Sequence, residues 1–300
     1  MEFIDQAKTG RNSFFSYLSG VLVILTLFIL GNSLLFFYLS IQFPNETMDS
    51  WTPTRISNYL GKTELLFWLT LPFTLVFCGL IIHINKVHGR LVKSIFTGKS
   101  KFDWKRVFFS FGLIFGILSL SLFVQNWFTL DLQFQFDYRK FIPLLFVSLI
   151  MLSLQTTCEE LIFRSYLLQG LKNRLLNSKA AVLISGIMFG AIHIGNPEIQ
   201  AIGYHILIYY IAVGVFLGLI TLFDNGLELA IGYHAANNIF AALVVTNDWQ
   251  AFQTDALFLD KSQPGFAWDI LVGILVVLPM IFLIFYKKYN WQSLKEKWNG

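Results

Sequence analysis

The sequence predicts an all-α, polytopic membrane protein, a bundle of about eight transmembrane helices. Of its 300 residues, 55% are hydrophobic and only 13% are charged, and the mean hydropathy is +0.61. A soluble globular domain carries about 25% charged residues. The apolar residues also gather in runs long enough for helices to cross the hydrocarbon layer, where every backbone polar group needs an internal partner.

Eight apolar runs define the expected helices, and most are close to the ~20 residues that one membrane crossing requires. In chain order they cover residues 17–40, 65–84, 107–127, 141–171, 180–194, 204–223, 227–245 and 268–286. The fourth run is longer than one crossing, so we expect it to tilt or to protrude. Pro72 and Pro279 lie inside two runs and are expected to kink them.

The basic residues indicate how these helices are oriented. The connection after the second run is strongly basic, with Lys86, Arg90, Lys93, Lys99, Lys101, Lys105 and Arg106 against Asp103. The tail is basic as well, through Lys287, Lys288, Lys295 and Lys297, whereas the connection before the last run holds Asp248, Asp255 and Asp260 against Lys261. By the positive-inside rule we expect a multi-pass protein of the cell membrane with both termini in the cytoplasm. Because the basic residues flank apolar runs, the net charge of +4 indicates no nucleic-acid partner.

Two adjacent carboxylates and an arginine lie inside the fourth run. Glu160 and Arg164 are four residues apart, so on a helix they share a face and are expected to form an ion pair. Glu159 is rotated by about 100° and cannot easily share that partner, which leaves its carboxylate free for chemistry. Ionisable groups inside a membrane span are costly and indicate function. The alternative is that they are interfacial charges at a helix end.

Two further pairs of residues four apart lie on later runs: Phe189 with His193, and His234 with Asn238. Each pair occupies one helical face. Glu159 and His193 are both about 17 residues, or about 25 Å of helix, from the middle of the basic turn 172–179. Antiparallel packing of the fourth and fifth helices would therefore bring them to one level. The remaining histidines, at 83, 88 and 205, lie at the edges of runs and are expected to be interfacial polar groups.

These residue types predict the hydrolysis of an amide bond. A carboxylate beside a neutral imidazole can hold and deprotonate a water. A second imidazole and an amide can donate hydrogen bonds to the developing oxyanion. The alternative is a zinc site, in which Glu159, His193 and His234 are the ligands and a water takes the fourth position. A metal-independent reaction without a cofactor is favoured, because zinc seldom uses an amide ligand such as Asn238.

The three motifs together resemble those of a known family. Residues 159–164 fit E-E-x-x-x-R, residues 189–193 fit F-x-x-x-H, and residues 234–238 fit H-x-x-x-N. In this order on three apolar runs they resemble the CAAX protease and bacteriocin-processing (CPBP) family of intramembrane proteases, which includes the CAAX prenyl endopeptidase of eukaryotes. The resemblance divides the chain into a three-span N-terminal region (1–140), a protease-like core (141–245), and an outer loop, last span and tail (246–300). Ser165 stands where many relatives have glycine.

The resemblance implies a role for each motif residue. Glu159 and His193 would activate the water, while His234 and Asn238 would form the oxyanion hole. Glu160 would pair with Arg164, supported by Phe189 of the second motif. The implied substrate is a membrane-associated peptide or protein, lipidated or bacteriocin-like.

Two other classes of function stay open at this stage. The first is a catalytically silent membrane factor that binds a peptide or confers immunity with the same fold. The second is a small proton-coupled transporter, which is ranked last because the sequence lacks the internal symmetry common among transporters. Pairs of small residues, Gly186 with Gly190 and Gly214 with Gly218, are expected to let neighbouring helices approach closely.

Overall fold

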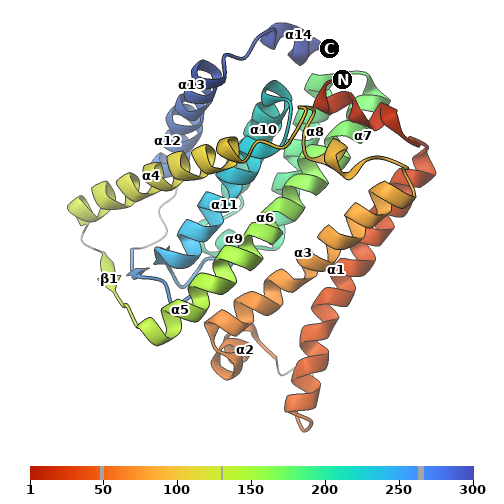
Figure 1. Ribbon diagram of the computed structural model, residues 1–300. Coiled ribbons are helices and arrows are strands. Elements are labelled where there is room, and N and C mark those ends of the chain that lie inside the picture. The colour runs from red at the N-terminus through yellow and green to blue at the C-terminus, as the bar shows by residue number, and fades with distance from the viewer. Residues whose placement is uncertain (48–50, 130, 263–266) are drawn as a thin grey trace.

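The computed structural model describes residues 1–47, 51–129, 131–262 and 267–300, and it confirms the all-α fold class. The α-helices are α1 (Phe14–Gln42), α2 (Pro53–Leu60), α3 (Lys62–Lys86), α4 (Trp104–Thr129), α5 (Tyr138–Val147), α6 (Ser153–Glu160), α7 (Leu168–Leu175), α8 (Ser178–Ala191), α9 (Pro197–Ile202), α10 (Ile206–Asp224), α11 (Glu228–Leu243), α12 (Ala267–Val272), α13 (Leu278–Tyr289) and α14 (Leu294–Asn299). Figure 1 shows the long helices side by side in a bundle, with both termini at the same end.

Shorter helical turns join several of these elements. Among the described residues three are 3₁₀-helical: η1 (Phe3–Thr9), η3 (Val92–Ile95) and η6 (Ile192–Gly195). Three are π-helical: η4 (Ser148–Leu152), η5 (Leu161–Leu167) and η7 (Gly273–Val277). The segments α5, η4, α6, η5 and α7 follow one another without a break as one 38-residue helix, Tyr138–Leu175. The fourth apolar run is therefore a single helix, longer than one crossing requires.

A small sheet at the opposite end from the termini joins two connections that are distant in the sequence (Figure 1). Its strands are β1 (Leu132–Phe134), β2 (Val245–Thr246) and β3 (Phe258–Asp260). The strand order is β1–β3–β2, with β1 antiparallel and β2 parallel to β3. Because β2 follows α11 directly, the sheet fixes that end of α11 to the connection after α4.

Seven helices in the described part of the chain are long and apolar enough to cross a membrane. The seventh expected span, 227–245, instead forms α11, which has 16 residues, fewer than the ~20 that a crossing helix needs. Of these residues 13 are buried, because α11 packs against α4, α6 and α10. The all-α bundle of about eight helices is confirmed, but α11 is shorter than the expected span and lies inside the bundle. It still runs from the end that holds the termini to the end that holds the sheet (Figure 1).

The glycine pairs do allow a close approach of neighbouring helices, and the two helices that meet there are α8 and α10. A Cβ atom added to Gly214 would lie 2.6 Å from the Gly186 carbonyl oxygen. One added to Gly186 would lie 2.6 Å from the backbone nitrogen of Val215. Only glycine therefore allows the two backbones to touch here, and this contact brings α10 within reach of the polar residues of η5.

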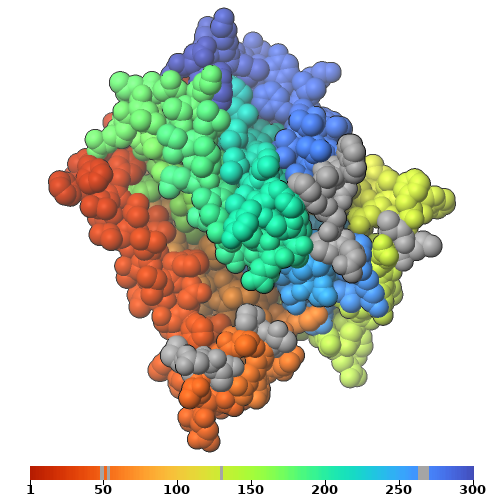
Figure 2. Space-filling view, turned by 180° about the vertical axis from the view of Figure 1, so that it is seen from behind, coloured from red at the N-terminus to blue at the C-terminus, as the bar shows by residue number. Residues whose placement is uncertain are grey.

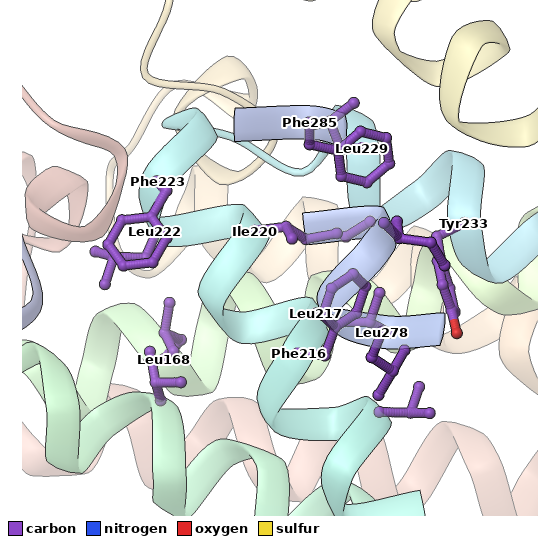
Figure 3. Close-up of a cluster of buried hydrophobic side chains, with 14 of the residues drawn as sticks. Leu168, Phe216, Leu217, Ile220, Leu222, Phe223, Leu229, Tyr233, Leu278 and Phe285 are labelled. Carbon is purple, nitrogen blue, oxygen red and sulfur yellow. The ribbon is translucent and has the colours of Figure 1, made fainter. Parts of the chain in front are cut away.

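The largest hydrophobic cluster lies where α10, α11 and α13 meet (Figure 3). Leu217 and Ile220 of α10 belong to this cluster together with Leu229 and Tyr233 of α11 and Phe285 of α13. Since lipid tails are as apolar as leucine, such packing holds membrane helices together through van der Waals contact rather than by exclusion of water. Ile114 of α4 belongs to the same cluster, which therefore supports α11 against both α4 and α10.

Ion pairs hold the turn between α10 and α11 at the end where the termini lie. Lys99 Nζ is 3.0 Å from both Asp224 Oδ2 and Glu228 Oε2. Arg106 also pairs with Asp224, whose Oδ1 accepts a 3.0 Å hydrogen bond from the Trp291 indole. Basic residues that the sequence offered only as orientation signals thus also fix the beginning of α11, the helix that carries the last motif.

Candidate active site

The two adjacent glutamates lie at the junction between α6 and the π-helical turn η5. Glu159 and Glu160 are the last residues of α6, and Arg164 belongs to η5. All three side chains are buried, and those of Glu160 and Arg164 are fully inaccessible. π-helical turns inside α-helices occur frequently at functional sites.

Glu160 contacts both the arginine of its own motif and the histidine of the last motif. Its Oε1 lies 3.2 Å from Arg164 Nη1, as the four-residue spacing predicts, and 2.7 Å from His234 Nδ1. An ionised carboxylate only accepts hydrogen bonds, so Nδ1 of His234 carries the proton and donates. The other ring nitrogen, Nε2, faces Glu159 Oε2 at 3.7 Å. Glu160 therefore orients His234 toward Glu159, a role that the sequence did not reveal.

Phe189 packs between the charged residues and the two histidines. Its ring lies 3.9 Å from the Arg164 guanidinium carbon, a cation–π contact. The same ring is edge-on to His234, with centroids 5.8 Å apart, and 4.8 Å from His193. Arg164 Nη2 also lies 3.4 Å from the Gly214 carbonyl oxygen, across the close contact with α10. Phe189 thus links all three motifs through packing.

His193 belongs to η6, directly after α8, and is half-buried. Its Nδ1 lies 2.7 Å from the Phe189 carbonyl oxygen, which can only accept. In the neutral ring, Nε2 is therefore left with a free lone pair. The ring stacks on Tyr210 of α10, with centroids 4.2 Å apart and an interplanar angle of 20°. His193 is held in the tautomer that a general base requires.

Gln155, one turn before Glu159 on α6, connects the first motif to the last. Its Nε2 lies 2.5 Å from Glu159 Oε1, and its Oε1 lies 3.0 Å from Asn238 Nδ2. Sequence reasoning missed both Gln155 and Tyr210. The available signal for Gln155 was an amide inside an apolar run, four residues from Glu159 and so on the same helical face. No comparable signal marks Tyr210.

The contacts of the two histidines fit both the metal-free reaction and the zinc alternative. Across the described ranges, no group of three or more His, Cys, Asp or Glu side chains is gathered in a way that could hold a metal ion. His234 Nδ1 is engaged by Glu160, and His193 Nδ1 by a backbone carbonyl. A metal-binding histidine usually makes such a contact with the ring nitrogen that does not bind the metal.

Comparison with known proteins matches the segment that holds these residues. Residues 141–240 fit the family model described as type II CAAX prenyl endopeptidase Rce1-like. This segment is therefore similar to an Rce1-like domain. The match supports the CPBP family that the motifs resemble, and the Rce1-like domain contains all three motifs.

A relative extends the similarity over nearly the whole chain. The uncharacterized protein YyaK of Bacillus subtilis (strain 168) is 28% identical over 291 residues, which cover 93% of this chain and 94% of that protein. No solved structure matches the chain. The regions on both sides of the Rce1-like domain therefore have a counterpart in the relative.

Proposed function

We propose that this protein is an intramembrane endopeptidase that hydrolyses a peptide bond of a membrane-associated peptide or protein without a metal ion. One observation carries the proposal. Within the Rce1-like domain, Glu160 holds His234 by its Nδ1, and Nε2 then faces the second carboxylate, Glu159. A free carboxylate, two oriented imidazoles and an amide are the groups that general-base hydrolysis requires.

In the proposed reaction, Glu159 takes a proton from water as the water oxygen attacks the scissile carbonyl carbon. The free Nε2 of His193 holds that water through its lone pair. The carbonyl oxygen becomes an oxyanion and accepts a hydrogen bond from the Asn238 amide. The proton held by Glu159 then passes to the leaving nitrogen as the carbon–nitrogen bond breaks.

His234 would serve as the second oxyanion donor through Nε2. Because Nδ1–H is donated to Glu160, Nε2 carries a proton only when the ring is an imidazolium. Two carboxylates against one guanidinium leave one negative charge in the buried site, and a protonated His234 would neutralise it. We propose that His234 donates to the oxyanion in this doubly protonated form.

The half-buried His193 indicates the side from which a substrate would approach. Its neighbours Ile192 and Ile194 are 54% and 51% exposed. In the face of the molecule that Figure 2 shows, the α9–α10 segment (teal) lies in the middle. A hollow separates this segment from α1 (red), and α3 (orange) lies behind the hollow. We propose that an extended peptide reaches His193 from the lipid-facing side through this hollow.

The direct test is a peptidase assay with purified protein in lipid vesicles. The substrates are a prenylated C-terminal peptide, its unprenylated form and an apolar bacteriocin-like peptide, with products identified by mass spectrometry. We expect cleavage by the wild type and by Glu64→Gln, a control on α3, but not by Glu159→Gln. Failure of the wild type to cleave any of them, with peptide binding retained, would favour the catalytically silent factor.

The metal-independent mechanism has its own test. Protein treated with a strong chelator and then checked by elemental analysis should cleave at the untreated rate. Stoichiometric zinc that is lost together with activity, and restores activity when returned, would overturn this mechanism and favour His234 as a ligand.

A further inference from the structure

Three amide side chains form a hydrogen-bonded line that ends on Glu159. Asn237 Nδ2 lies 3.5 Å from Asn238 Oδ1, Asn238 Nδ2 lies 3.0 Å from Gln155 Oε1, and Gln155 Nε2 lies 2.5 Å from Glu159 Oε1. Every donor in the line points toward the carboxylate. The proposed reaction uses Glu159 and Asn238 but gives no role to the residue between them.

The chemistry of the carboxylate fixes the direction of the whole line. Since ionised Glu159 only accepts, Gln155 must turn its NH₂ group toward it and its carbonyl oxygen toward α11. Asn238 must then offer its own NH₂ group to that oxygen. An amide NH₂ carries two hydrogens, so one N–H of Asn238 is used by Gln155 and the other is free to meet an oxyanion.

The line also spans two helices that are far apart in the sequence. Gln155 is 4% exposed and crosses from α6 to α11, over a separation of 83 residues. At its far end, Asn237 lines a cavity of about 250 Å³ between α4, α11 and the connection that follows α11. Other polar side chains around this cavity include Ser121, Asn247 and Gln250. The amide line thus runs from a polar cavity to the buried carboxylate.

We propose that Gln155 is a positioning residue of the hydrolase: it holds the Glu159 carboxylate and turns the Asn238 amide so that its second N–H faces the reacting carbonyl. This inference rests on the proposed function. In the proposed reaction Gln155 itself contacts neither the substrate nor the attacking water. It acts through two residues whose placement decides the rate, and a displacement of about 1 Å at such groups costs about 10²-fold.

The discriminating variant is Gln155→Met, which keeps the volume and removes both hydrogen bonds. We expect kcat to fall about 10²-fold while KM changes less than about twofold, because transition-state contacts are lost and substrate binding is kept. A merely structural role would lower the melting temperature and leave kcat of the folded fraction unchanged. Gln155→Glu keeps the acceptor for Asn238 but places a like charge beside Glu159, so it should not restore kcat.

A matched control exists on the same long helix. Gln169 is equally buried, but it contacts Arg90 and the Ser94 carbonyl, well away from the motif residues. Gln169→Met should lower the melting temperature and leave kcat within about twofold of the wild type, since the change is of the same kind outside the site. A Gln155→Met variant that also keeps kcat within about twofold would overturn the inference.

The link between Gln155 and Asn238 can be tested by combining variants. In an Asn238→Ala background one partner of Gln155 is already missing, so Gln155→Met should lower kcat by a smaller factor than in the wild type. If the fold losses in kcat of the two single variants multiply in full in the double variant, Gln155 does not act through Asn238. That result would overturn the proposed link between these two residues.

A second measurement separates this inference from the proposed function. If the wild type cleaves nothing, the proposed function fails. The melting temperatures of the same single and double variants still test the amide line. If the melting temperature of the double variant falls by less than the sum of the two single decreases, the amide line is supported. Decreases that add in full would overturn it.

Discussion

Glu160 is the residue on which the geometry of the site depends most. One of its oxygens accepts from both Arg164 and His234, and all three side chains are buried. The other oxygen, Oε2, has no hydrogen-bond partner among the described residues. Removing the carboxylate would leave the Arg164 cation buried without the carboxylate that it pairs with and would release His234 from its orientation. Substitution of Glu160 is therefore expected to lower both stability and activity. Substitution of Glu159 is expected to lower mainly activity.

Single substitutions of the two glutamates should have different effects on stability and on activity. Glu160→Gln or Arg164→Met should destabilise the protein by about 3–5 kcal/mol, the cost of breaking a buried ion pair. Glu159→Gln keeps the hydrogen-bonding shape and should abolish turnover with a much smaller loss of stability. Thermal unfolding in detergent, measured beside the peptidase assay, checks both statements. Equal destabilisation by all three variants would show that Glu159 is structural as well.

His88 lies outside the membrane-spanning helices and makes the stability of the protein depend on pH. Its side chain is buried, with Nδ1 2.6 Å from the Arg11 carbonyl oxygen and Nε2 3.1 Å from the Tyr166 hydroxyl. Burial lowers the pKa of His88 below its usual value of 6.5, helped by the nearby His83 and Arg90, while the hydrogen bond to Arg11 opposes the shift. The fold therefore favours the neutral ring.

The sign of the pH effect follows from this shift. Between the lowered pKa of folded His88 and 6.5, the unfolded chain binds more protons, so stability falls as the pH is lowered through this interval. The melting temperature of the wild type should therefore fall more between pH 7.5 and pH 5.5 than that of His88→Asn. The asparagine keeps a donor for the Arg11 carbonyl but does not titrate. Parallel curves for the two proteins would contradict the assignment.

At the scale of single elements, α11 shows where the sequence is informative and where it is not. Hydropathy located it, but a helix buried inside a bundle is as apolar as one that faces lipid, so the pattern could not separate the two. Its interior position is visible at Gly232, where an added Cβ would lie 2.3 Å from the Val107 carbonyl oxygen. The backbones of α4 and α11 therefore touch at this point.

A pair of glycines tests this contact. Gly232→Ala should lower the melting temperature, because α4 must move away from α11, and it should reduce turnover by displacing His234 two residues later. Gly112 on α4 has open space around an added Cβ. Gly112→Ala should leave the melting temperature unchanged or raise it, since alanine favours helix by about 1 kcal/mol over glycine. If the two substitutions had the same effect, the backbone contact would not be limiting.

The sequence predicted contacts within one helix better than contacts between helices. The Glu160–Arg164 pair follows from helical periodicity, and so does the shared face of His234 and Asn238. The hydrogen bond from His234 to Glu160 joins residues 74 positions apart, and periodicity carries no information about such a pair. Gln155 was missed for the same reason: its position on the face of Glu159 could be predicted, but its partner on α11 could not.

At the scale of the whole molecule, the positions of the termini and of the basic residues agree with one orientation. Both termini lie at the same end of the bundle (Figure 1). Lys99 and Arg106 lie at that end, where both form ion pairs with the α10–α11 turn. The small sheet formed by β1, β2 and β3 lies at the other end, where the connection after β2 holds the acidic residues. This separation of charge is what the positive-inside rule requires of a helical membrane protein.

The orientation can be tested by labelling single cysteines from outside intact cells. Ser100 and Lys261 are both exposed, Ser100 in the basic connection before α4 and Lys261 just after β3. Cys78 is exposed and is replaced by serine in the background, whereas Cys158 is buried and can stay. With the termini in the cytoplasm, a membrane-impermeant maleimide should label Lys261→Cys in intact cells and Ser100→Cys only after permeabilisation. The reverse pattern would invert the topology, and labelling of both positions in intact cells would mean that the two ends do not face opposite sides of one membrane.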